Sequence, residues 1–246
     1  MKISVAQVQL SGSLRANLDK IKAYTARALG EGVHLLAFPE TALTGYVYEQ
    51  FLEVDYEEVE GALGSLQDLV LNTDMCLVVG TPMRAEGHVR NSAVVLFPDG
   101  KRAVYHKRCL TAYESAYFEA GEEELLFTHR GHQVGVLVCR DQNRPEYAAA
   151  LKKGGARVVC ILSAHYYELV ESRMKREKNA ALPVVRAYEN NLFVCKANSV
   201  GTIRGKISYG GSMIVDPRGI VVVRGSEQGE ELLSYEADLG RNDLVW

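Results

Sequence analysis

The sequence predicts an α/β fold that forms one domain. Apolar runs of strand length, rich in Val, Ile and Leu, alternate along the chain with segments whose apolar residues recur at helical spacing. Gly and Pro fall in the short connections, and no internal repeat or linker divides the chain. With 246 residues, 47% of them hydrophobic, the chain can bury one substantial core, so we treat residues 1–246 as a single domain.

The first half of the chain is predicted to contain two helices among its strands. Leu18, Ile21 and Ala28 recur on one face of a helix that follows the first apolar run. Asp99-Gly100 is a turn-forming pair between two short apolar runs, which predicts a β-hairpin. The predicted elements are strand 2–8, helix 14–29, strand 33–38, helix 61–71, strand 75–80, and strands 92–97 and 101–106.

The second half is predicted to alternate strand and helix and then to close with strands. The segment after the apolar run 133–138 is rich in Ala, Leu and Lys, which favour a helix that starts at residue 144. The predicted elements are strands 125–128 and 133–138, a helix from 144, strand 157–162, a long helix 169–189, and strands 192–197, 208–215, 220–223 and 232–237.

Three of the predicted strands are followed by a side chain that can take part in catalysis. Glu40 follows strand 33–38, Lys107 follows strand 101–106, and Cys139 follows strand 133–138. Ligands bind beyond the carboxyl ends of strands in α/β sheets, so these three side chains could converge there. Together they supply a base, an oxyanion stabiliser and a nucleophile. Taken singly, each has a simpler explanation: a surface turn carboxylate, a solvated strand end and a buried core thiol.

Cys139 has the placement expected of a nucleophile. It lies where strand 133–138 turns toward the helix from residue 144, which would hold the thiol rigidly. The positive end of the helix dipole is expected to favour the thiolate form of this side chain.

The chain resembles the nitrilase superfamily of carbon–nitrogen hydrolases along nearly its whole length, with motifs in the same order and at similar spacing. The motifs that carry the resemblance are Ala6-Gln7, Pro39-Glu40 with Gly45-Tyr46, Tyr105-His106-Lys107-Arg108, Cys139 with Asp141 and Pro145-Glu146, Arg186-Ala187-Tyr188-Glu189-Asn190, Ala197-Asn198, Gly210-Gly211-Ser212 and Asp216-Pro217-Arg218-Gly219. The resemblance implies a four-layer αββα sandwich, with two sheets between outer layers of helices. It also implies that Glu40, Lys107 and Cys139 form a catalytic triad.

The superfamily carries a second glutamate in the loop after the lysine. Glu114, in a segment closed by Gly121, resembles this residue, and Glu119 is the alternative because the length of the loop varies. The resemblance implies that Glu114 orients Lys107 or holds the substrate nitrogen. It further implies that the backbone N–H of Arg140 helps to stabilise the oxyanion, and that no metal or organic cofactor is needed.

The acyl pocket is expected to decide which substrate is used. The candidates to line it are Tyr46, Tyr113, His165, Tyr166 and Arg204. Arg204 could bind a carboxylate bidentately, which would favour ω-amides of small dicarboxylates or N-carbamoyl amino acids. Alternatively, Arg204 is an exposed loop residue without a specific role. His165 stands where many relatives have an Asn-like residue, and it could instead cap the following helix.

The residues after the cysteine favour an amide over a nitrile as substrate. Asp141 stands two residues after Cys139, as it does in amidases and carbamoylases, whereas true nitrilases have Trp-Glu after the cysteine. Asn143 occupies the place of an arginine that is common in amidases, and Arg144 follows it, so no role is carried over for that guanidinium. We therefore rank a hydrolase of small linear amides first, acting through a thioester intermediate. An N-carbamoyl amino acid or amine hydrolase, a nitrilase and a non-catalytic member of the fold are the alternatives.

Composition argues against a nucleic-acid or membrane partner. The net charge of −3 and the pI of about 6.1 give no basic footprint, and the densest basic cluster, 173–178, is expected to be the solvated face of a helix. No apolar run approaches the roughly 20 residues needed to span a bilayer, and the N-terminus lacks the apolar core of a signal peptide. We expect a cytoplasmic protein that acts on a small amide or carbamoyl substrate and assembles as a homodimer or higher homo-oligomer.

The cysteine content points to reduced thiols. Five cysteines, an odd number placed mostly in apolar strands, suit a reducing compartment, and no Cys/His spacing suggests a structural metal. Cys109 lies two residues beyond Lys107, and its role is open.

Overall fold

Two six-stranded sheets form the centre of the structure, a computed structural model that describes residues 1–240 apart from the side chains of Tyr48 and Gln50. The first sheet has the order β14 (Glu231–Glu236), β1 (Lys2–Gln7), β2 (Leu35–Ala37), β3 (Cys76–Ala85), β4 (His88–Leu96) and β5 (Arg102–His106). The second has the order β13 (Val221–Arg224), β12 (Met213–Val215), β9 (Phe193–Asn198), β8 (Ala156–Ser163), β7 (His132–Val138) and β6 (Leu126–His129). A separate two-stranded ribbon joins β10 (Val200–Ile203) to β11 (Lys206–Tyr209).

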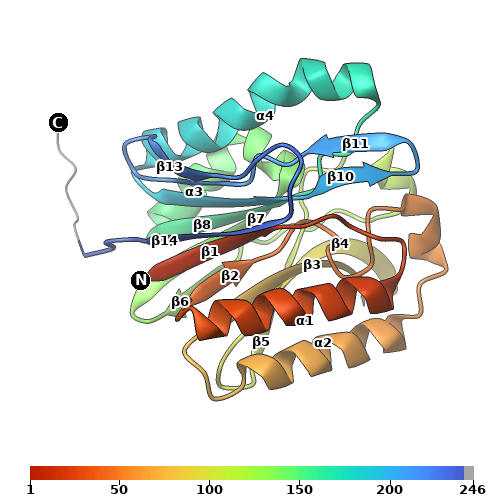
Figure 1. Ribbon diagram of the computed structural model, residues 1–246, viewed down its shortest axis with the longest axis horizontal. Coiled ribbons are helices and arrows are strands. Elements are labelled where there is room, and N and C mark those ends of the chain that lie inside the picture. Colours follow the sequence, from red (N-terminus) through yellow and green to blue (C-terminus); the bar gives the residue numbers. More distant parts are fainter. Residues whose placement is uncertain (241–246) are drawn as a thin grey trace.

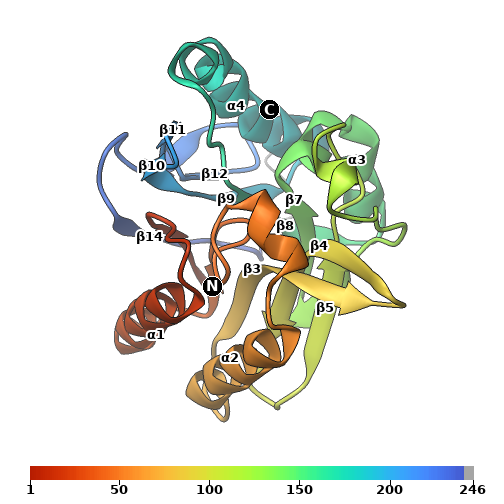
Figure 2. The ribbon, with the colours of Figure 1, turned by 90° about the vertical axis from the view of Figure 1, so that its right-hand side faces the viewer.

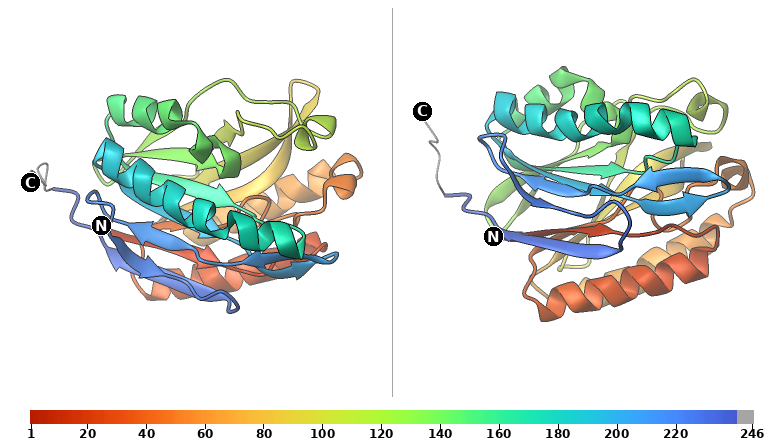
Figure 3. Two further views of the ribbon diagram at one scale, coloured as in Figure 1. Left: turned by 90° about the horizontal axis from the view of Figure 1, so that it is seen from above. Right: turned by 45° about the horizontal axis from the view of Figure 1, so that its top comes forward.

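Four α-helices cover the outer faces of the two sheets (Figures 1 and 3). Helices α1 (Leu14–Gly30) and α2 (Tyr56–Val70) lie on the first sheet, and α3 (Pro145–Lys153) and α4 (Leu169–Asn190) lie on the second. Short 3₁₀ helices are η1 (Tyr48–Leu52), η2 (Glu114–Ala116) and η3 (Cys139–Asn143). The predicted four-layer αββα sandwich is therefore confirmed. None of the helices within residues 1–240 combines the length and the apolar character needed to cross a membrane.

The central strands β1 and β2 and the first part of β3 are buried on both faces, which explains their nearly continuous apolar runs. In β2, Leu35 and Ala37 belong to the core between the two sheets, whereas Leu36 belongs to the core beneath α1 and α2. The same alternation in β1 places Ile3 and Val5 between the sheets.

Strand direction brings the ends of β2, β5 and β7 toward one side of the molecule. β1, β2 and β3 run parallel, and β5 runs in the same sense as β3 because both are antiparallel to β4. In the second sheet β7, β8 and β9 are parallel. Figure 2 views the molecule from the end at which β1 finishes, where the loops gather.

Several predicted boundaries differ from the structure: β3 and β4, for example, extend to Ala85 and from His88, beyond the predicted 75–80 and 92–97. Two of the differences have a clear local cause. Helix α2 begins at Tyr56 rather than at residue 61, because the side chain of Asp55 accepts hydrogen bonds from the backbone N–H groups of Glu57 and Glu58, whose charges also suit a helix N-terminus. The strand predicted over 208–215 is two elements, since Gly210 and Gly211 adopt positive φ angles of 53° and 66° and interrupt it.

The β10–β11 hairpin was not predicted at all. Its turn contains Arg204 and Gly205, with φ angles of 46° and 78°. Two consecutive positive φ angles are typical of a tight hairpin turn, but an Arg-Gly pair is a weak sequence signal for one.

The backbone of the Pro39-Glu40 segment passes very close to Gly80 of β3. This close contact helps to position Glu40. A Cβ atom on Gly80 would lie 2.3 Å from Pro39 O and 2.7 Å from Glu40 Cα. Only a residue without a side chain leaves room for the Pro39-Glu40 segment against β3.

We predict that Gly80→Ala destabilises the protein by about 2 kcal/mol, since the surrounding backbone has to move to accommodate the methyl group. The same shift should displace Glu40 and lower the rate of turnover. Gly64→Ala is the control: nothing lies within 4 Å of its Cβ position in α2, so alanine should stabilise by about 0.5–1 kcal/mol. Thermal unfolding of both variants tests this prediction. Equal changes in the free energy of unfolding in the two variants would contradict it.

Candidate active site

Glu40, Lys107, Glu114 and Cys139 come together at the ends of β2, β5 and β7. Lys107, Glu114 and Cys139 line a cavity of about 110 Å³, and Glu40 is fully buried behind its wall. The cavity is lined by Tyr46, Lys107, Thr111, Glu114, Cys139, Arg140, Gln142, Asn143, Ala164, His165, Tyr167, Lys175, Lys178 and Asn179. The convergence predicted from the strand ends is what the structure has.

Glu40 is held by contributions from both sheets. Its Oε1 accepts hydrogen bonds from Lys107 Nζ at 2.7 Å and from Asn91 Nδ2, on β4, at 2.8 Å. Its Oε2 accepts a hydrogen bond from the backbone N–H of Ala164, just after β8, at 3.1 Å. Both carboxylate oxygens are therefore occupied, which fixes the orientation of the carboxyl group. The contributions of Asn91 and Ala164 had no sequence signal, because they depend on neighbouring strands.

The second glutamate at the site is Glu114. Lys107 Nζ donates a hydrogen bond to Glu114 Oε1, and the backbone N–H of Thr111 donates to Glu114 Oε2 at 2.8 Å. The backbone N–H of Glu114 in turn donates to Thr111 Oγ1 at 3.1 Å, so the loop holds the carboxylate in place. Glu119 lies at the surface, where its carboxylate is 2.9 Å from His88 Nδ1.

Two carboxylates share one buried ammonium, and this sets the pKa of each group. Burial raises the pKa of Glu40, and the neighbouring Glu114 raises it further, against the opposing effect of Lys107. Burial acts on Glu114 in the same direction, but the charge and hydrogen bond of Lys107 outweigh it and lower the pKa. Burial alone would lower the pKa of Lys107, yet the nearby acidic groups hold it well above its usual value. Lys107 is therefore a permanent cation, and Glu40 is the carboxylate that more readily takes up a proton.

Cys139 is the first residue of η3 and lies in a strained turn directly after β7. Its φ angle of 49° lies in the left-handed region, which costs a residue with a side chain about 1–3 kcal/mol. Asp141 stabilises the turn, since its Oδ2 accepts hydrogen bonds from the backbone N–H of Val138 at 3.0 Å and from Tyr105 Oη at 2.8 Å. Its Oδ1 accepts one from the backbone N–H of Cys109 at 2.7 Å. Asp141 thus links the cysteine turn to the loop after Lys107, and Cys109 contributes its backbone to this link.

The expectation that the helix dipole favours a thiolate is wrong. Burial raises the pKa of the Cys139 thiol, and the Glu40 carboxylate beside it raises the pKa further by charge and by a hydrogen bond. Cys139 begins only the short η3, and α3 starts at Pro145, too far along the chain to offset these effects. At neutral pH the resting residue is a thiol.

The predicted acyl-pocket residues divide into two groups. Tyr46, His165 and Arg140 line the cavity. Tyr166 does not, because its hydroxyl is used in the core: it accepts a hydrogen bond from the N–H of Leu10 at 3.3 Å and donates to Val200 O at 3.2 Å. The next residue, Tyr167, lines the cavity instead.

Tyr113 and Arg204 lie outside the cavity wall. Tyr113 is 48% exposed, and its hydroxyl donates a hydrogen bond to Glu49 Oε1 at 2.9 Å. The exposed Arg204 guanidinium is 3.4 Å from Glu49 Oε2. A carboxylate-binding role for Arg204 therefore has no support in the geometry.

The cavity wall also corrects the interpretation of the basic cluster 173–178. Lys175 and Lys178 of α4 line the cavity rather than a purely solvated face. His165 does not cap a helix: its backbone N–H donates to Asn198 Oδ1 at 3.1 Å, and its ring stacks on Tyr167. Burial, followed by the charges of Lys196 and other lysines, holds the pKa of His165 well below its usual value, so the ring is neutral.

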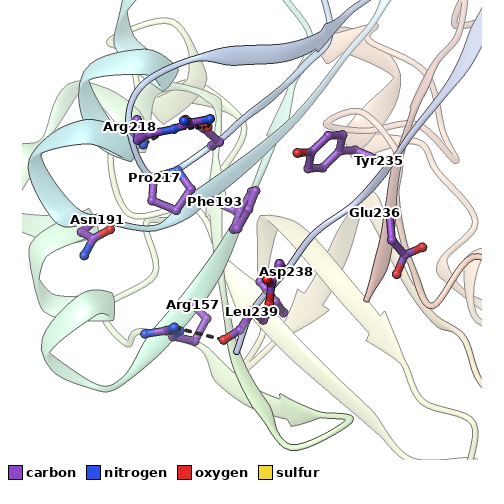
Figure 4. Close-up of a pocket in the computed structure, with 10 residues that line it drawn as sticks. Arg157, Asn191, Phe193, Pro217, Arg218, Tyr235, Glu236, Asp238 and Leu239 are labelled. Carbon is purple, nitrogen blue, oxygen red and sulfur yellow. Dashed lines mark hydrogen bonds and ion pairs between the residues drawn. The ribbon is translucent and has the colours of Figure 1, made fainter. Parts of the chain in front are cut away.

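Another cavity, of about 160 Å³, lies at the opposite ends of the parallel strands (Figure 4). It is lined by Arg157, at the start of β8, and Phe193, at the start of β9. Both of its arginines are engaged: Arg218 pairs with Asp216, and Arg157 donates to Leu239 O at 3.0 Å. No cluster of His, Cys, Asp or Glu within residues 1–240 is arranged to hold a metal ion.

Comparison with known families identifies the chain. The model of the family described as carbon–nitrogen hydrolase matches residues 2–244. The chain belongs to the carbon–nitrogen hydrolase family. This confirms the resemblance to the nitrilase superfamily that the sequence motifs indicated.

Relatives within the family include amidases and a nitrilase. The chain is 32% identical over 247 residues to an (R)-stereoselective amidase of Pseudomonas sp., covering 99% of this chain and 86% of the relative. It is 32% identical over 245 residues to a nitrilase of Pyrococcus abyssi, covering 96% and 90%.

A solved structure of similar fold carries a modified cysteine. It is a variant of the amidase from Nesterenkonia sp. AN1, with the acetamide moiety of fluoroacetamide covalently added at the active site cysteine. The two chains are 27% identical, superpose with a TM-score of 0.86, and align over 98% of this chain and 91% of the other.

We predict that Glu40→Gln lowers the pKa of the Cys139 thiol, because it removes the negative charge that most strongly disfavours the thiolate. A pH titration of the ultraviolet absorbance of the thiolate, taken as the difference from Cys139→Ala, measures this. The midpoint should move to lower pH in Glu40→Gln and stay unchanged in Glu119→Gln, whose carboxylate is at the surface. An unchanged or higher midpoint in Glu40→Gln would show that Glu40 does not control the thiol.

Proposed function

We propose that this protein is a cysteine-dependent amidase. It hydrolyses the non-peptide C–N bond of a small amide, and it releases ammonia and a carboxylic acid through a thioester on Cys139. The observation that carries the proposal is a cysteine in a strained turn that lines a small cavity beside the buried Glu40–Lys107–Glu114 cluster.

Glu40 acts as the base in the first step. The thiol proton of Cys139 moves to the Glu40 carboxylate as the sulfur attacks the carbonyl carbon of the amide. The raised pKa of Glu40 suits this role, because a carboxylate that is costly to keep ionised in a buried site readily accepts a proton. The base is also adjacent, since its hydrogen bond to the thiol contributes to the pKa of Cys139.

Lys107 and the backbone N–H of Arg140 stabilise the oxyanion that forms on the carbonyl oxygen. The Lys107 ammonium keeps its charge throughout, since the carboxylates hold its pKa well above the usual value. Loss of one oxyanion donor typically reduces the rate on the order of 10²–10³-fold. Glu114 keeps the ammonium in position and takes no proton, in keeping with its lowered pKa.

The second half of the reaction returns the site to its starting state. Protonated Glu40 gives its proton to the leaving amide nitrogen as the C–N bond breaks, which releases ammonia. Glu40 then takes a proton from water, and the resulting hydroxide attacks the thioester carbonyl. As the C–S bond breaks, Glu40 returns this proton to the sulfur of Cys139. The products are a carboxylic acid and the Cys139 thiol.

We further propose that the enzyme is a cytoplasmic homodimer or a small multiple of one. Helix α4 exposes a row of apolar side chains from Val170, 70% exposed, through Met174, 78% exposed, to Tyr188, 59% exposed. Such a row is unusual for a free surface and suits contact with a second copy of the chain. All five cysteines are free thiols, which fits a reducing compartment. Sedimentation at micromolar concentration should show a dimer or larger species, and a monomer would contradict the proposal.

We predict that Cys139→Ala abolishes ammonia release and leaves the thermal unfolding temperature close to that of the wild type. Ammonia release is measured with short amides, N-carbamoyl amino acids and nitriles as test compounds. Cys109→Ala is the matched control, because Cys109 contributes its backbone N–H and not its thiol to Asp141; it should retain activity. A fully active Cys139→Ala variant would refute the mechanism. Ammonia released only from carbamoyl compounds or only from nitriles would replace the amidase proposal with that activity.

A further inference from the structure

A second cavity lies next to the catalytic one, beneath α4. Its volume is about 120 Å³, and His165, Tyr167 and Asn179 belong to the walls of both cavities. The rings of His165 and Tyr167 stack with their centroids 5.9 Å apart. Because these side chains are common to both cavities, the two cavities adjoin one another.

Lys196 of β9 is the distinctive group in this second cavity. It is 2% exposed, and its Nζ donates a hydrogen bond to Asn179 O at 2.8 Å. Within residues 1–240, the structure records no other hydrogen bond from this ammonium and no carboxylate oxygen within 4 Å of it. A buried cation without a counter-ion is costly, so an anion bound in the cavity would be strongly favoured.

The other charged groups of the cavity do not neutralise Lys196. Glu227 forms an ion pair with Arg176, and the remaining charged groups that line the cavity are Arg224 and the exposed Glu177. His165 is neutral, so its ring can serve as a hydrogen-bonding partner without adding charge. The charged groups that line the cavity therefore sum to a net positive charge, and the neutral His165 ring adds a polar group to its wall.

Lys196 is also close enough to the reacting sulfur to sense its charge. Burial lowers the pKa of Lys196 to about 8, and an ionised Cys139 acts in the opposite direction. The route between them runs along the ends of two paired strands: Lys196 pairs with Ile161 of β8, and His165 follows that strand. A ligand that enters at Cys139 and passes His165 would reach the ammonium.

We propose that Lys196 binds a carboxylate at the far end of the acyl group, so that the preferred substrates are monoamides of short dicarboxylic acids. The amide carbon would lie at Cys139 and the carboxylate at Lys196, with the His165–Tyr167 pair along the chain between them. The inference rests on the proposed amidase function and names its substrate class. Lys196, rather than Arg204 as the sequence suggested, is then the residue that binds the substrate carboxylate.

The test compares charged and uncharged amides of matched length: succinamate and glutaramate against butyramide and valeramide. In Lys196→Met, kcat/KM for the two acids should fall on the order of 10²-fold, because a charge-assisted hydrogen bond is lost. For the uncharged amides it should stay within a few-fold of the wild type. Lys152→Met is the matched control, since Lys152 also donates to a backbone carbonyl, Asn191 O, but lies outside both cavities; it should leave the preference unchanged.

Equal losses on charged and uncharged amides in Lys196→Met would overturn the inference, as would a wild-type enzyme with no preference for the acids. If the methionine variant fails to fold, Lys196→Arg tests the same point. It keeps the positive charge and should keep a preference for the acids, and its loss would count against the inference. Absence of ammonia from every amide would instead refute the proposed function itself.

The pH dependence of the wild type gives an independent readout. The ratio of kcat/KM for succinamate to that for butyramide should fall as pH rises through about 8, where free Lys196 loses its proton. The ratio isolates Lys196 from groups that act on both substrates, such as Cys139 and Lys107. The other charged groups that line the cavity are Arg176 and Glu177 of α4, Arg224 of β13, and Glu227. Lys178 of α4, which lines the catalytic cavity, also acts on the pKa of Lys196. A ratio that is flat with pH would contradict the assignment.

Discussion

The buried ammonium of Lys107, held between Glu40 and Glu114, is the interaction on which the rest of the site depends. The three side chains are 0–2% exposed; Glu40 follows β2, whereas Lys107 and Glu114 belong to the connection after β5, so the cluster fixes the relative positions of these two segments. Removing one partner of a buried pair leaves an uncompensated charge, at a cost of about 3–5 kcal/mol. With two carboxylates and one ammonium, the cluster carries an excess of negative charge. The two carboxylates respond differently to this excess: the pKa of Glu40 is raised, so it takes up a proton more readily, whereas the pKa of Glu114 is lowered.

The same cluster determines how the cysteine can act. Its negative charge and the burial of the site keep Cys139 protonated at rest, so the nucleophile has to be generated during the attack by transfer of its proton to Glu40. The fold holds the two groups ready for this transfer. Gly80 allows the Glu40 segment to approach β3, and Asp141 secures the strained turn at Cys139. Backbone geometry and electrostatics thus serve the same proton transfer.

Sequence reasoning succeeded where a simple geometric rule applied and failed where neighbours in space decided the outcome. The convergence of Glu40, Lys107 and Cys139 followed from their positions after strands. The pKa of Cys139 could not be predicted, because it depends on burial and on Glu40, which is remote in sequence. Tyr166 was expected to line the cavity but lies in the core, since a one-residue offset from Tyr167 turns its side chain away from the cavity. Lys196 stands inside an apolar strand, and nothing in its local sequence distinguishes it from a solvated lysine.

The most direct test of the account is to trap the reaction on Cys139 during turnover. An amide substrate is mixed with enzyme and quenched in acid within the first turnovers, and the digested protein is analysed by mass spectrometry. We predict that the acyl group of the substrate appears on the peptide that contains Cys139. If the substrate carries an isotope label in its acyl group and is then diluted with unlabelled substrate, the label should leave this peptide at the rate of turnover. Ammonia release without an acylated Cys139, or with the acyl group on another residue, would contradict the mechanism.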